Sequence, residues 1–139
     1  MSETDPDHWL HRFTARQWIQ AALGELGRAE AAYGANDARG GMAGARRAAG
    51  MALNGALVVD PDPSWGRSYM EHLAALARDT TVPEAVRDAA RTLVEARAPG
   101  TSVIGLRSRA GDERILEAAR DVMAHAYARV VHHEERQTG

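Results

Sequence analysis

The spacing of apolar residues between positions 111 and 134, GDERILEAARDVMAHAYARVVHHE, constrains the fold of this chain more than any other feature. At about 100° per residue, apolar steps of three and four positions place side chains in one stripe along an α-helix. Such a stripe needs other elements to cover it, so the segment predicts a helix packed into a bundle. Asp112 is the predicted N-cap and Glu134 the predicted end. The stripe comprises Leu116, Ala119, Met123, Ala126 and Val130, with Ile115 and Val122 at its margin.

The same spacing recurs in four earlier segments, and no stretch alternates long enough to predict a β-strand. The first predicted helix begins after Thr14, whose capping box Gln17 completes, and ends with Gly34 as its C′ residue. The others cover residues 38–58, 68–78 and about 82–98, and residues 99–111 are a predicted loop. The sequence thus predicts an all-α fold, a four- to five-helix up-and-down bundle. The expected core includes Ile19, Leu23, Leu26, Tyr33, Leu53, Met70 and Leu73, with Asn54 as a buried hydrogen-bonding residue.

The second predicted helix is unusually rich in glycine. Each glycine inside a helix costs about 1 kcal/mol relative to alanine, so a compensating interaction is expected. Glycine lets another backbone approach closely, which predicts that this helix lies at the centre of the bundle or at a dimer interface. The glycines stand at positions 40, 41, 44, 50 and 55, and the arginines at 39, 46 and 47 argue against a membrane-spanning helix.

Length and composition predict one domain whose core is stable without disulfides or bound metal. The chain has 139 residues, no cysteine and a net charge of -2, which excludes disulfides and thiolate chemistry and gives no overall attraction to nucleic acid. We expect an N-terminal tail over residues 1–13, held by Trp9 and Phe13, a bundle over 14–134 and a C-terminal tail over 135–139. No membrane contact, DNA, metal or cofactor is expected, because phosphate-binding and zinc-binding motifs are missing, and adjacent residues such as His132 and His133 chelate poorly. A cytoplasmic location is expected.

One set of residues in the last helix has a chemical pattern: Arg120, His125 and Tyr127, spaced R-x4-H-x-Y. On a helix, Arg120 and Tyr127 fall at one edge of the apolar stripe, whereas His125 lies about 140° from Arg120. One straight helix therefore cannot direct Arg120 and His125 at the same atom, and a shared site needs a groove or a second copy. The alternative is structural: Arg120 and Tyr127 extend over the stripe's edge, and His125 pairs with Asp121.

Three stretches of the sequence resemble HEPN domains, which are small helical bundles of prokaryotic defence and toxin systems. WIQAALGELGRAEAAY at 18–33 is similar to their first helix, and ARRAAGMALNGAL at 45–57 to their second, followed by YMEHLAALA. RDVMAHAY in the last helix is similar to the R-x4-H-x-Y of HEPN toxins paired with a nucleotidyltransferase antitoxin. The chain departs from that pattern at Asp121, where an uncharged residue is common, and at Gly50 and Asn54.

The resemblance implies a metal-independent endoribonuclease that acts at a homodimer interface, with RNA and a nucleotidyltransferase as partners. His125 would then exchange a proton with the ribose or the leaving oxygen, and Arg120 would stabilise the phosphate in the transition state. Tyr127 would match the tyrosine that the partner enzyme adenylylates. The residues leave two alternatives open: a non-catalytic HEPN-like module that binds a nucleotide or a partner protein, and a helical homodimer of unrelated role.

Overall fold

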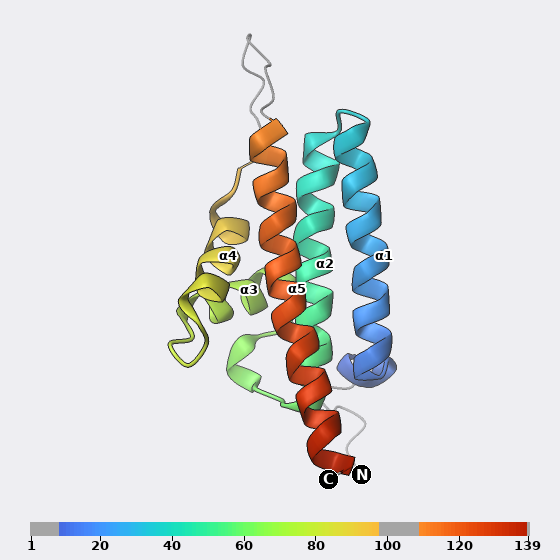
Figure 1. The fold of residues 1–139 in the computed structure, drawn as a ribbon, viewed down its shortest axis with the longest axis vertical. Helices are drawn as coiled ribbons and strands as arrows, with labels where there is room; N and C mark the ends of the chain where they lie inside the picture. Colours follow the sequence, from blue (N-terminus) through green and yellow to red (C-terminus); the bar gives the residue numbers. More distant parts are fainter. Residues whose placement is uncertain (1–8, 98–108, 139) are drawn as a thin grey trace.

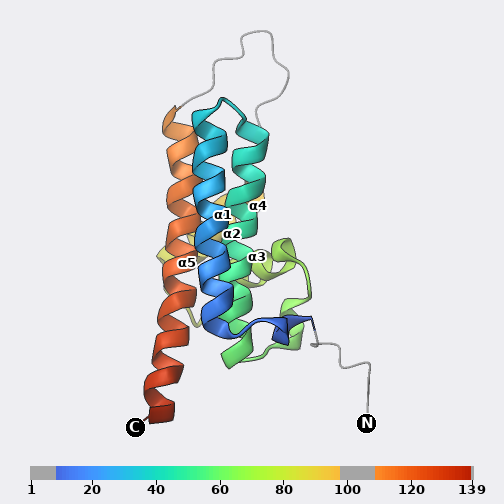
Figure 2. The ribbon, with the colours of Figure 1, turned by 90° about the vertical axis from the view of Figure 1, so that its right-hand side faces the viewer.

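The fold is an all-α bundle, as the apolar spacing predicts (Figure 1). The computed structural model describes residues 9–97 and 109–138, and the predicted loop over 99–111 therefore lies mostly outside the described residues. Helix α1 runs antiparallel to both α2 and α5, and the short helices α3 and α4 lie on the other side of α5 (Figures 1 and 2). The elements are η1 (Leu10–Arg12), α1 (Ala15–Gly34), α2 (Ala38–Val59), η2 (Pro63–Trp65), α3 (Tyr69–Arg78), α4 (Glu84–Glu95) and α5 (Arg109–Thr138).

Side-chain caps define where helices α1, α2 and α3 begin. Thr14 and Gln17 form the predicted capping box of α1, and Asp37 accepts from the backbone N–H of Gly40 at the start of α2. Ser68 and Glu71 form a capping box at α3. Helix α4 begins at Glu84 without a side-chain cap, and the nearby Thr81 hydroxyl donates to Asp79 instead.

Several predicted ends differ from the observed ones. Gly34 is the last residue of α1, and the left-handed residue after the helix is Asn36, with φ 64°. Helix α5 already includes Arg109 and continues to Thr138, so Asp112 is not its cap and residues 135–138 are helical instead of forming a tail. At the other end, Leu10 is 3% exposed and its carbonyl accepts from Trp18 Nε1 at 2.8 Å, so residues 10–12 belong to the bundle.

Helix α2 lies at the centre of the bundle, which confirms one of the two predicted places for its glycines. A Cβ added at Gly44 would lie 3.0 Å from Ala29 Cβ and 3.2 Å from Ala29 Cα, so α1 approaches α2 through this position. A Cβ at Gly55 would lie 2.9 Å from the Ala15 carbonyl oxygen. At Gly44 and Gly55 the cost of a glycine inside the helix is therefore offset by the close contact of α1 and α2.

The core follows the predicted stripes with three informative exceptions. Leu23 is 57% exposed and Met70 is 39% exposed, although the spacing predicts both to face inward. Conversely, the polar side chain of His72, on α3, is fully buried. Helical periodicity assigns a face to each residue, but the width of the covered face depends on which helices pack there.

His72 is held by hydrogen bonds at both ring nitrogens. Nδ1 lies 2.9 Å from the Trp65 carbonyl oxygen, and Nε2 lies 2.9 Å from the side-chain amide of Asn54, which is itself fully buried as predicted. The Trp9 ring stacks on the imidazole at 6.2 Å. These contacts join η1, η2, α2 and α3 around one buried polar pair.

Arg46 ties α4 to the central helix. Its guanidinium donates to the backbone carbonyl oxygens of Leu93 at 2.8 Å and of Ala96. Those carbonyls belong to the last turn of α4, where oxygen atoms lack helical partners. The neighbouring Arg47 forms an interhelical ion pair with Glu25 at 2.8 Å. Among the described residues, no helix is long and apolar enough to cross a bilayer.

Candidate functional site

Arg120 lies on the side of α5 that faces α1, and three carboxylates surround its guanidinium. Glu30 of α1 lies 2.8 Å away, and Glu117 and Glu113 of α5 lie 3.4 Å and 3.6 Å away. The hydrogen bond to Glu30 raises the pKa of Arg120, and burial partly opposes this rise. The guanidinium is therefore charged but engaged, and the local field around it is negative on balance.

Tyr127 lies on the same side of α5 as Arg120 and is 42% exposed. Its hydroxyl accepts from Arg16 Nη1 at 3.1 Å, and the Arg16 guanidinium lies 5.2 Å from the centre of the tyrosine ring. Arg16 also donates to both carboxylate oxygens of Glu134, at 2.7 Å and 3.0 Å, which raises the pKa of Arg16 and lowers that of Glu134. A cation–π and ion-pair cluster thus joins the start of α1 to the end of α5.

His125 faces different neighbours from those of Arg120 and Tyr127. It is half-buried, and its charged neighbours are Asp79, at the end of α3, and Arg129, which pairs with Asp60. Burial lowers the pKa of His125, Arg129 lowers it further and Asp79 partly opposes them. No described residue hydrogen-bonds its buried Nε2 atom. A neutral imidazole with a free nitrogen can accept a proton, but it is not a ready proton donor near pH 7.

Within one chain, the three predicted site residues Arg120, His125 and Tyr127 therefore do not meet at one place. Arg120 and Tyr127 lie along the α1 side of α5, and His125 lies among residues at the end of α3 and of α2. The groove that Arg120 and Tyr127 line does not include His125. This division agrees with the angle of about 140° expected on a straight helix.

An open groove between α1 and α5 is the feature that the sequence did not predict. It has a volume of about 570 Å³, and its lining is mostly apolar. Its floor is Ala52 of α2, which is fully buried and too small to fill the space between the two flanking helices. One residue in the sequence could have indicated the groove: Leu23 belongs to the apolar stripe of α1 but lies at the edge of that stripe. The lining side chains are Arg16, Ile19, Gln20, Leu23, Leu26, Ala52, Arg120, Met123, Ala124 and Tyr127.

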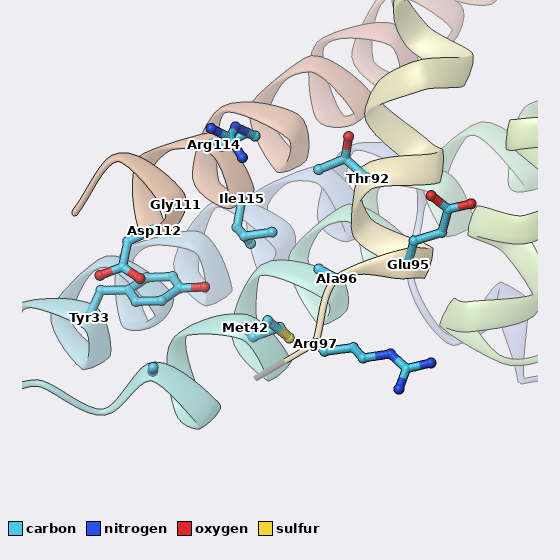
Figure 3. Close-up of a pocket in the computed structure, with 11 residues that line it drawn as sticks. Tyr33, Met42, Thr92, Glu95, Ala96, Arg97, Gly111, Asp112, Arg114 and Ile115 are labelled. Carbon is cyan, nitrogen blue, oxygen red and sulfur yellow. The ribbon is translucent and has the colours of Figure 1, made fainter. Parts of the chain in front are cut away.

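A second cavity, of about 450 Å³, lies where α4 ends against α2 and α5 (Figure 3). Tyr33, Met42 and Ile115 form its apolar part, and the charged residues at its border are of both signs. It contains none of Arg120, His125 and Tyr127. Among the described residues, no group of three or more histidine, aspartate or glutamate side chains is placed to hold a metal ion.

Comparison with known proteins does not assign this chain to a family. The sequence matches no protein-family model, and no curated protein or solved structure is significantly similar to it. The HEPN resemblance therefore stays a prediction that rests on the three quoted stretches.

Two histidines with lowered pKa values, the fully buried His72 and the half-buried His125, predict that the fold is less stable in acid. Burial is the largest cause that lowers the pKa of both His72 and His125. Because the unfolded chain binds protons at about pH 6.5 and the folded chain only at lower pH, the free energy of unfolding falls as pH drops below about 6.5. We expect His125→Gln to reduce the loss of stability between about pH 7.5 and 5.5, measured as urea midpoints.

The matched control is His132→Gln, whose histidine is exposed near the end of α5. It should leave the same pH dependence as the unchanged chain. Identical slopes for His125→Gln and the unchanged chain would contradict the assignment of His125 as a half-buried neutral group.

Proposed function

We propose that this chain is a non-catalytic helical module, HEPN-like in its sequence pattern, that acts by binding a protein partner. The observation that carries the proposal is the state of Arg120. Its guanidinium is engaged by Glu30, Glu113 and Glu117, so a phosphate approaching it meets an excess of negative charge. The position of His125 among other neighbours supports the same conclusion, because a proton-transfer group must reach the atom that the arginine stabilises.

A protein partner is favoured over a nucleotide by the groove between α1 and α5. Nucleotide phosphates need unengaged cationic groups or backbone N–H donors, whereas both arginines of the groove are held by carboxylates. The exposed Leu23 and Tyr127 instead offer apolar and aromatic surface, which is typical of protein interfaces.

The ribonuclease remains a second proposal because Arg120 and Tyr127 do lie together on one side of α5. A catalytic reading then requires a homodimer in which His125 comes from the other copy. This second proposal predicts that the chain forms a homodimer, which light scattering measures, and that its partner is a nucleotidyltransferase.

Incubation of the purified chain with total RNA in excess EDTA separates the two proposals. We expect no cleavage above the background of Arg120→Ala and His125→Ala, because the proposed module has no working nuclease site. A mass spectrum of the same sample checks that Tyr127 is unmodified. EDTA-resistant cleavage that disappears in both variants would contradict the non-catalytic module and establish the ribonuclease.

A further inference from the structure

The groove between α1 and α5 has the dimensions of a helix-binding site. On α1 the lining of the groove runs from Arg16 to Leu26, about 15 Å, and Glu30 lies one helical turn beyond it, so the surface offered to a partner is about 21 Å long, or about 14 helical residues. The walls are two nearly antiparallel helices (Figure 2), and the floor is the small side chain of Ala52. A third helix laid along such a groove buries one apolar face and keeps its backbone hydrogen bonds internal.

The exposed apolar surface of the groove extends from its Arg16 end, where Tyr127 lies, to Leu23 near its middle. Leu23 is 57% exposed on one wall, and Tyr127 is 42% exposed on the other. Ile19, Leu26 and Met123 lie deeper and are nearly covered by their own chain. An incoming apolar side chain would therefore contact Leu23 and Tyr127 first and exclude water from the pocket between them.

The two ends of the groove differ in charge. At the Arg120 end, one guanidinium is opposed by three carboxylates, and Glu113 and Glu117 are each 65% exposed at their side chains. At the Arg16 end, one guanidinium and the carboxylate of Glu134 compensate each other. The excess negative charge at one end selects a partner with positive charge there and also fixes its direction.

We infer that the groove between α1 and α5 receives an amphipathic helix of a partner protein, apolar along one face and basic at the end that meets Glu30, Glu113 and Glu117. This inference rests on the proposed function, since it names the partner's chemistry and the surface that binds it. Arg16 and Arg120 border the groove but are not its binding groups in this arrangement, because carboxylates already pair with both guanidiniums.

Synthetic helices test the inference directly. The probes are peptides of about 16 residues with leucines along one face and three arginines in the first or the last turn, each beside a copy with glutamates in place of the arginines. By fluorescence anisotropy, we expect one arginine peptide to bind about tenfold more tightly than its glutamate copy, because two or three exposed ion pairs contribute about that much. Leu23→Glu should abolish the binding, and Met70→Glu, an exposed position on α3, should leave it unchanged.

Reversing the charges of the groove distinguishes binding at this site from nonspecific hydrophobic binding. The double variant Glu113→Arg, Glu117→Arg should reverse the preference toward the glutamate peptide, and Glu135→Arg, near the end of α5, should not. Equal binding of both peptides, binding that survives Leu23→Glu, or no binding at all would overturn the inference. A dimer that Leu23→Glu dissociates would also overturn it, because the groove would then be the contact between two copies.

The experiments show separately whether this inference fails and whether the proposed function fails. RNA cleavage in EDTA contradicts the non-catalytic module whatever the peptides do, whereas absent peptide binding in an RNA-inactive protein rejects only the helical partner.

Discussion

Replacing Gly44 by leucine is expected to destabilise the bundle by about 3 kcal/mol, because α1 passes directly over this position. A single added Cβ would already lie 3.0 Å from Ala29 Cβ and 3.2 Å from Ala29 Cα, and a leucine adds three further carbons in the same space. The helices can relieve the overlap only by separating along their length, which removes apolar contacts on both sides. Urea unfolding followed by circular dichroism measures the loss, and a domain with a total stability of roughly 5–15 kcal/mol will show it clearly.

The matched control for this substitution is Ala43→Leu. Ala43 precedes Gly44 on the same helix and is exposed, so the added side chain meets solvent and not α1. We expect a change within about 0.5 kcal/mol. Equal effects of the two leucines would show that the close approach of α1 and α2 does not depend on Gly44.

Replacing His72 by alanine is expected to cost about 3 kcal/mol or more, for two reasons that add. The ring is fully buried, so its removal leaves a cavity beneath Trp9 and beside α2. The Trp65 carbonyl and the Asn54 amide also lose the partner that each of them reaches at 2.9 Å. Thermal unfolding of the variant should show a midpoint lower by several degrees, and His132→Ala, at an exposed position, should show almost none of this change.

The hydrogen bonds of His72 also determine its protonation. Burial lowers the pKa of the ring, so it is neutral near pH 7. A carbonyl oxygen only accepts, so Nδ1 donates to Trp65 and Nε2 must accept from the Asn54 amide. A half-turn of that amide brings its Nδ2 to the ring and gives this otherwise unpaired nitrogen its partner. Asn54→Asp should therefore destabilise the fold near neutral pH, because a carboxylate cannot donate to Nε2; equal urea midpoints for the variant and the unchanged chain would contradict this assignment.

Local chemistry was sufficient to predict the helices and most of their beginnings. Thr14 and Ser68 cap helices because their side chains satisfy backbone N–H groups nearby in the sequence, and such contacts do not depend on the rest of the fold. The extent of α5 was harder to predict. Gly111 and Asp112 form a normal start signal, but the helix includes them, and local preference is weak against the packing of a long helix.

The sequence by itself determined that this chain is an all-α bundle with a glycine-rich central helix, because periodicity and the steric freedom of glycine are properties of single segments. It also determined that Arg120 and His125 point apart, since helical geometry fixes that angle. Only the tertiary structure decided that Glu30 of α1 engages Arg120, that His72 finds Asn54 in the core, and that Leu23 borders an open groove. Each of these depends on which surfaces of distant segments meet, and that is set by the packing of whole helices.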